Sequence, residues 1–101
     1  SNDSILNYGS LQIDTNNHRV VRDGVTVDLT VREYAILEYL VRNRNIVVTR
    51  EQIRANIWSI DDDINSNVVD VYIRYLRRKI DDPFEEKLIH TIRGVGYRLE
   101  C

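Results

Sequence analysis

The sequence predicts an α+β domain in which a four-stranded antiparallel sheet is followed by three helices and a closing β-hairpin. Three observations support this prediction. Short runs rich in Val and Ile alternate with turn dipeptides over the first thirty residues, two capping motifs and one amphipathic stretch then mark helices, and a glycine turn lies near the end. With 101 residues, of which 43 % are hydrophobic, the chain is long enough to form one domain around one core.

The N-terminal strands are predicted over residues 5–8, 11–15, 18–22 and 25–29. Turn residues separate them, and the dipeptide Asp23-Gly24 is the strongest of these signals. Both central residues of the favoured two-residue hairpin turn need positive φ, which Asp and Gly tolerate. Four short strands joined by tight turns indicate an antiparallel meander.

Two helices are predicted from capping boxes. In the pair Thr30 and Glu33, the hydroxyl accepts from the backbone N–H of Glu33 while the carboxylate accepts from the N–H of Thr30. Thr49 and Gln52 repeat the pattern. We therefore expect a first helix from Thr30 to about Arg42 and a short second helix after Thr49.

A third helix is predicted after an acidic loop over residues 59–65, with Asn65 or Ser66 as its cap and Asp81-Asp82-Pro83 as its end. Its core-facing side is predicted from four apolar residues at helical spacing, Val69, Ile73, Leu76 and Ile80.

The last strands are predicted over residues 88–92 and 97–100, joined by a turn through Arg93, Gly94, Val95 and Gly96. Glycines supply backbone freedom there. Three helices followed by a hairpin is the order of a winged helix-turn-helix, in which the last helix enters the DNA major groove and the hairpin forms a wing beside it. The predicted fold class is therefore a winged helix-turn-helix with an N-terminal sheet and a three-helix core.

The distribution of charged residues bears on whether the partner is a nucleic acid. A net charge of −2 does not by itself favour nucleic acid, because neutralising phosphates contributes most of the non-specific affinity. The charge is segregated, however. Residues 66–80 contain four cations and the single acid Asp70, whereas Asp61, Asp62 and Asp63 stand together just upstream.

Composition also limits the location and chemistry of the protein. The sequence has no apolar run near the roughly 20 residues that a membrane helix needs, and no secretory signal. Its one cysteine, Cys101, cannot close an internal disulfide, so we expect a reducing cytoplasm. His18 and His90 have no neighbouring ligands, and the aspartates lack the pattern of a calcium loop. We expect no metal, no cofactor and no catalytic activity.

A helical wheel, drawn with Val69 facing the core, gives the candidate DNA contacts. The outward side is predicted to carry Asn67, Val71, Arg74, Tyr75 and Arg78. Asn and Arg suit bidentate contacts with base edges, and Val and Tyr suit apolar contacts with thymine methyls or sugars. Arg77 and Lys79 flank this side and reach toward phosphates. Arg93, at the tip of the wing, fits a narrow minor groove.

Two alternatives compete with this interpretation. An Arg-rich helix face can be simple solvated surface, and some winged helices bind proteins through exposed Tyr and Val rather than DNA. Replacing Arg74, Arg78 or Arg93 by Ala distinguishes these alternatives, because it weakens the affinity for the partner only if that partner is DNA. An enzyme is a remote third option, since no nucleophile motif is recognisable.

Residues 67–80 (NVVDVYIRYLRRKI) and 89–99 (IHTIRGVGYRL) closely resemble the recognition helix and wing of OmpR/PhoB-type response regulators, and residues 29–37 (LTVREYAIL) resemble their first helix. The resemblance covers nearly the whole chain. It implies that Val71, Tyr75 and Arg77 lie near base edges, that Trp58, Thr91 and Tyr97 approach phosphates, and that Arg93 enters the minor groove. Many relatives carry Arg where this chain has Asn67 and Tyr75, so we expect a different target and a shallower salt dependence.

The resemblance also implies partners. The loop formed by Ile60, Asp61, Asp62, Asp63 and Ile64 corresponds to one that can touch RNA polymerase. Such domains normally follow a receiver domain that a sensor histidine kinase controls by phosphorylation, and nothing before Ile5 could form one. We expect this chain to be a single domain over residues 1–101, monomeric alone and dimeric on tandem or paired half-sites.

Overall fold

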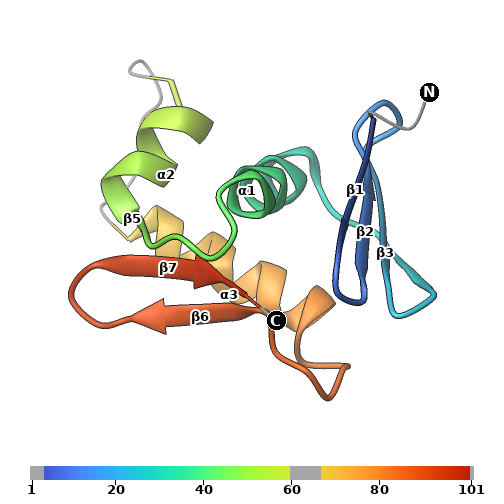
Figure 1. The fold of residues 1–101 in the computed structure, drawn as a ribbon. Coiled ribbons are helices and arrows are strands. Elements are labelled where there is room, and N and C mark those ends of the chain that lie inside the picture. The colour runs from blue at the N-terminus through green and yellow to red at the C-terminus, as the bar shows by residue number, and fades with distance from the viewer. Residues whose placement is uncertain (1–3, 60–66, 101) are drawn as a thin grey trace.

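The computed structural model describes residues 4–59 and 67–100. The elements follow the predicted order, with one additional short strand (Figure 1). Their bounds are β1 Ile5–Tyr8, β2 Leu11–Asp14, β3 Arg19–Arg22, β4 Val25–Val27, α1 Val31–Arg42, β5 Val48–Thr49, α2 Arg50–Ile57, α3 Val68–Ile80, β6 Ile89–Ile92 and β7 Gly96–Leu99.

The N-terminal sheet is the predicted antiparallel meander, in the order β1-β2-β3-β4. Asp23 and Gly24 adopt φ values of 53° and 80°, as the hairpin turn requires. Three of the strands are shorter than predicted. β2 ends at Asp14 because its carboxylate accepts from the backbone N–H groups of Asn16 and Asn17 and so starts a turn.

Both capping boxes are confirmed. In α1 the Thr30 hydroxyl lies 3.3 Å from the Glu33 nitrogen, and Glu33 Oε1 lies 2.9 Å from the Thr30 nitrogen. In α2 the corresponding distances between Thr49 and Gln52 are 3.1 and 2.9 Å. These local bonds fix where the two helices begin.

The predicted cap of α3 is wrong. The N-cap is Asn67, one residue beyond the predicted Ser66, and its side chain makes no capping hydrogen bond. Asn65 and Ser66 themselves lie outside the described residues. Because α3 begins without a side-chain acceptor, a search for capping residues could not locate its start.

The additional strand, β5, was not predicted. It has two residues, too few for any periodic pattern, and it exists because it pairs with β7 through Val48 opposite Tyr97 and Thr49 opposite Gly96. The C-terminal sheet therefore has three strands in the order β5-β7-β6. A Cβ placed on Gly96 would lie 2.0 Å from the Val48 carbonyl oxygen, so this close pairing needs glycine.

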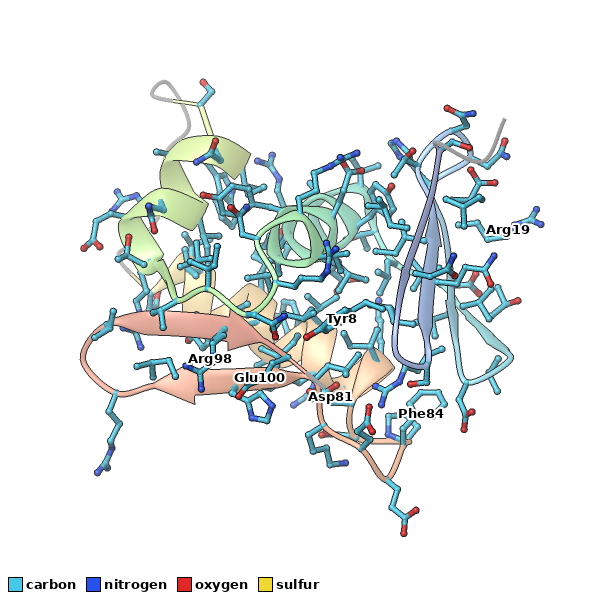
Figure 2. All side chains as sticks on the ribbon, in the orientation of Figure 1. Tyr8, Arg19, Asp81, Phe84, Arg98 and Glu100 are labelled. Atoms are coloured by element: carbon cyan, nitrogen blue, oxygen red, sulfur yellow. The ribbon has the colours of Figure 1, made fainter. Side chains whose placement is uncertain are left out.

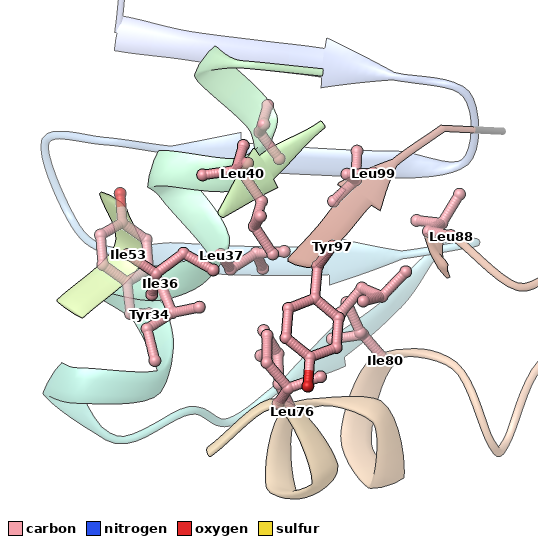
Figure 3. Close-up of a cluster of buried hydrophobic side chains, with 14 of the residues drawn as sticks. Tyr34, Ile36, Leu37, Leu40, Ile53, Leu76, Ile80, Leu88, Tyr97 and Leu99 are labelled. Carbon is pink, nitrogen blue, oxygen red and sulfur yellow. The ribbon is translucent and has the colours of Figure 1, made fainter. Parts of the chain in front are cut away.

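The core lies where α1, α3 and the C-terminal sheet meet. Figure 1 shows α1 between the N-terminal sheet and α2, with α3 passing beside β6 and β7. In Figure 3, Leu37 and Leu40 of α1 lie in one cluster with Leu76 and Ile80 of α3 and with Leu99 of β7. The four residues predicted to face the core from α3 are all buried.

A buried ion pair ties the N-terminal sheet to the end of α3. Arg22 of β3 is 1 % exposed, and its Nη1 lies 3.4 Å from Oδ1 of Asp81, which is 2 % exposed. Arg22 also donates to the backbone carbonyls of Ile80 and Glu86. Its guanidinium carbon lies 4.9 Å from the centre of the Phe84 ring, and Figure 2 shows Asp81 and Phe84 close together below the sheet.

Candidate nucleic-acid interface

The outer side of α3 is open to solvent. Asn67, Arg74 and Arg78 are exposed, Tyr75 is 41 % exposed and Val71 is half-buried. Residues one or two positions away are buried in the core, so the amphipathic division of the helix follows the predicted wheel. This arrangement presents amide, guanidinium and phenol groups together on one rigid helix.

The wing also ends in an exposed cation. Arg93 lies in the turn between β6 and β7 and is exposed, and Gly94 beside it has a φ of +74° that favours glycine. The Val95 nitrogen donates to the Ile92 carbonyl at 3.0 Å and closes the turn. A narrow hairpin therefore carries the Arg93 guanidinium away from the core.

Arg77 joins α3 to the wing. Its Nη2 donates to the Thr91 hydroxyl at 2.6 Å and to the Ile89 carbonyl oxygen at 3.2 Å. The guanidinium carbon also lies 5.6 Å from the centre of the Tyr97 ring. Arg77 and Thr91 were predicted separately, as a base contact and a phosphate contact, and the structure brings them together.

Tyr97 is 4 % exposed, and its hydroxyl donates to Oδ1 of Asp70. The same carboxylate oxygen accepts from Nε of Arg50 at 2.8 Å. Burial raises the pKa of the Asp70 carboxyl, but the hydrogen bonds from Tyr97 and Arg50 outweigh this effect and hold its pKa below the ordinary value of 3.8. Burial and the Asp70 carboxylate both raise the pKa of Tyr97. Asp70 is therefore charged, and the Tyr97 hydroxyl keeps its proton.

Trp58 ends α2 and is 8 % exposed. Its ring contacts Tyr72 edge-on at 5.4 Å between centroids, and Tyr72 contacts Tyr75 in the same way at 5.7 Å. The Arg32 guanidinium lies 5.1 Å from the Trp58 ring centre. Aromatic contacts thus join the end of α2 to the exposed side of α3.

Lys79 is paired with an acid of α1. Its Nζ donates to Oε1 of Glu33 at 2.7 Å, and the Glu33 side chain is only 4 % exposed. Burial raises the pKa of Glu33, but the bonds from Lys79 and Thr30 outweigh it and hold the pKa below 4.5. Lys79 thus pairs α3 with the capping box of α1.

Sequence reasoning predicted the capping role of Glu33 but missed its ion pair with Lys79 and the ion pair of Arg50 with Asp70. Asp70 did stand out as the single acid among the cations of residues 66–80, and that exception was the available signal. Nothing in the sequence indicated the ion-pair partners of Arg50 and Glu33, because these partners lie 20 and 46 residues away. The predicted polymerase-facing residues Ile60, Asp61, Asp62, Asp63 and Ile64 lie outside the described residues.

Over residues 4–59 and 67–100, no three His, Cys, Asp or Glu residues come together as a metal site would require. In the same part of the chain, every helix is too short or too polar to cross a membrane.

Comparisons with known proteins agree with this geometry. The profile of the family described as transcriptional regulatory protein, C terminal, matches residues 24–99. The transcriptional regulatory protein YkoG of Bacillus subtilis is 45 % identical over 97 residues, which cover 96 % of this chain and 42 % of YkoG. Response regulator ArlR of Staphylococcus saprophyticus is 46 % identical over 94 residues, covering 93 % and 43 %. The chain thus spans less than half the length of these relatives.

Solved structures show the same likeness. The Thermotoga maritima response regulator DrrB, an OmpR/PhoB homologue, superposes with a TM-score of 0.85 at 35 % identity, covering 97 % of this chain and 45 % of DrrB. The DNA-binding domain of Klebsiella pneumoniae RstA, solved in complex with the RstA box, has a TM-score of 0.83 at 30 % identity, covering 95 % and 96 %.

Proposed function

Because this chain belongs to the OmpR/PhoB family of response-regulator DNA-binding domains, we propose that it binds duplex DNA sequence-specifically as the output domain of a two-component transcription regulator. In this proposal α3 enters the major groove, and Arg93 enters the adjacent minor groove. Solved complexes of relatives such as the RstA domain with DNA support the proposal.

One observation carries this proposal. Arg74 and Arg78 on α3 and Arg93 on the wing are all exposed, and the two elements that carry them are joined directly by the bonds of Arg77. Guanidinium groups presented by a rigid helix and its neighbouring hairpin suit a polyanion with two grooves. A net charge of −2 does not oppose this, because Asp70 is the single acid among the four cations of residues 66–80.

The candidate contacts divide into bases, phosphates and contacts within the protein. We assign Asn67, Val71, Arg74, Tyr75, Arg78 and Arg93 to the bases. Trp58 and Thr91 approach phosphates, while Arg77 and Tyr97 reach the DNA only at the edge of the surface, since both are held by intramolecular bonds. Lys79 is reassigned from phosphate contact to the pair with Glu33.

The remaining partners follow from the family. We propose that the full-length protein dimerises on tandem or paired half-sites, because one recognition helix reads too few bases for useful specificity. A receiver domain, phosphorylated through a sensor histidine kinase, would bring two copies together. The acidic loop over residues 59–65 would face RNA polymerase, and the site of action would be the bacterial cytoplasm.

A binding-site selection followed by a mobility shift tests the proposal. A duplex is first selected from a random-sequence pool with the wild-type chain, and its affinity for Arg93→Ala is then measured. We expect the loss of Arg93 to weaken binding by about 1 to 3 kcal/mol, or roughly five- to 150-fold. Arg19→Ala is the control, because Arg19 is an exposed cation on the N-terminal sheet that points away from the helices (Figure 2).

Unchanged affinity in Arg93→Ala would refute the placement of the wing. If Arg74→Ala and Arg78→Ala also bind the selected duplex as the wild type does, the surface serves a protein partner instead. Failure of the wild-type chain to enrich any duplex would count against DNA binding altogether.

A further inference from the structure

Three elements meet at one oxygen atom. Oδ1 of Asp70, in the first turn of α3, accepts from Nε of Arg50 at the start of α2 and from the hydroxyl of Tyr97 in β7. The Arg50 guanidinium carbon also lies 5.3 Å from the centre of the Tyr97 ring. One carboxylate therefore links both helices of the helix-turn-helix to the wing.

The position of Asp70 conflicts with simple charge arguments. It is an acid on the helix proposed to enter the major groove, and its side chain is 40 % exposed, so it lies near phosphates of the same sign. An acid in the first turn does favour the helix dipole. That benefit is available to any acid in the turn, however, and does not account for bonds to two other elements.

Tyr97 transmits the position of Asp70 to the wing. In β7 it pairs with Val48 on one side and with Thr91 on the other, so it lies in the central strand of the C-terminal sheet. Arg77 stacks on the same ring and holds Thr91. The Tyr97 side chain is thus held by Asp70, Arg50 and Arg77, and β7 directly follows the turn that carries Arg93.

We propose that Asp70 is a positioning residue that holds the wing in register with the recognition helix, so that Arg93 reaches the minor groove while α3 lies in the major groove. Asp70 does not itself contact DNA in this proposal. It orients the residues that do, so that their geometry is set before binding. The proposal deepens the proposed function and depends on it for its effect on DNA affinity.

The direction in which Asp70→Ala changes the affinity for DNA distinguishes a positioning role from a purely electrostatic one. Removing a negative charge near phosphates strengthens DNA binding if charge alone matters. If Asp70 positions the wing, Asp70→Ala instead weakens binding to the selected duplex by at least about threefold, which exceeds the scatter expected of independent effects. Glu51→Gln is the matched control, because it removes an exposed acid beside Arg50 without breaking the network. It should bind the duplex as tightly as the wild type or more tightly.

A double-mutant cycle separates positioning from general destabilisation. A merely structural role for Asp70 leaves the effect of Arg93→Ala unchanged. Positioning predicts that Arg93→Ala weakens binding at least about threefold less in the Asp70→Ala background than in the wild type. Tyr97→Phe, which removes only the hydroxyl, should reproduce this coupling. Additive effects, or tighter binding by Asp70→Ala, would overturn the inference.

A DNA-free measurement keeps the inference testable even if the proposed function fails. Amide hydrogen exchange in β6 and β7 should be faster in Asp70→Ala than in the wild type, while exchange in α1 stays unchanged. Equal protection of the wing in the two proteins would show that Asp70 does not hold it. Absence of wild-type DNA binding with faster wing exchange would refute the proposed function alone.

Discussion

Arg22 shows how a charged residue fits into the core of a small domain. It ends the predicted strand over residues 18–22, where nothing in the sequence indicates burial, yet its side chain is almost wholly buried. Its nitrogen atoms bond to Ser10 at 2.7 Å, to Asp81 and to two backbone carbonyls, so each of its three nitrogen atoms has an acceptor. Asp81 in turn accepts from the backbone nitrogens of Leu88 and Ile89. A buried charge is stable only with such partners.

Breaking this pair should therefore destabilise the domain strongly. Asp81→Ala leaves a buried guanidinium without its counterion and two backbone N–H groups without acceptors. We expect a loss of about 3 to 5 kcal/mol in the free energy of unfolding, measured by urea denaturation. Asp82→Ala, at the neighbouring exposed position, should change it by no more than about 0.5 kcal/mol. Equal effects at the two positions would show that the buried pair contributes little.

At the scale of elements, the two glycines of the wing act for different physical reasons. The sequence suggested that both supply backbone freedom, and this is correct for Gly94, whose φ is +74°. Gly96 instead supplies space. Its missing Cβ lets β7 approach β5, where the Val48 carbonyl oxygen and the Thr49 Cα would otherwise clash. The same contact seats the wing against the start of α2.

Substitutions at the two glycines should distinguish the need for positive φ at Gly94 from the need for space at Gly96. Gly96→Ala forces β5 and β7 apart, and we expect it to cost roughly 1 to 3 kcal/mol or more, as overpacking does. A Cβ on residue 94 meets no atom within 4 Å, and Asn tolerates positive φ, so Gly94→Asn should cost less than about 1 kcal/mol. Thermal unfolding followed by circular dichroism measures both. A harmless Gly96→Ala would mean that β5 is dispensable.

The whole molecule separates structural charges from charges open to a partner. The cations of α3 and the wing that remain exposed are Arg74, Arg78 and Arg93, whereas Arg77 and Lys79 are engaged by other residues of the chain. The chain can therefore carry a net charge of −2 and still present a basic surface. The N-terminal sheet lies on the other side of α1 from α2 (Figure 1).

This distribution predicts the salt dependence of DNA binding. Each phosphate neutralised contributes about 0.9 to the slope of log affinity against log salt concentration. A guanidinium at a base edge also lies among the phosphates and displaces counterions, so Arg78→Ala should reduce the slope by at most about 1. Arg19→Ala should leave the slope unchanged, because Arg19 lies on the N-terminal sheet. Mobility-shift titrations of the selected duplex at several salt concentrations measure both slopes, and equal reductions would argue against a localised basic surface.

What the sequence alone determined was local or periodic. Capping boxes, the turn at Asp23-Gly24 and the spacing of apolar residues on α3 each act within a few residues, so they placed the helices, the hairpins and the outward face that carries Arg74 and Arg78. The resemblance to a known family added the partners of that face only as expectations.

What only the tertiary structure decided depends on residues far apart in the chain. The Arg22 and Asp81 pair spans 59 positions, Lys79 and Glu33 span 46, and Tyr97 and Asp70 span 27. Strand β5 and the need for glycine at Gly96 likewise exist only because two segments meet. Such contacts leave no periodic signal, because their free energy comes from burial and from bonds that form only once the chain has folded.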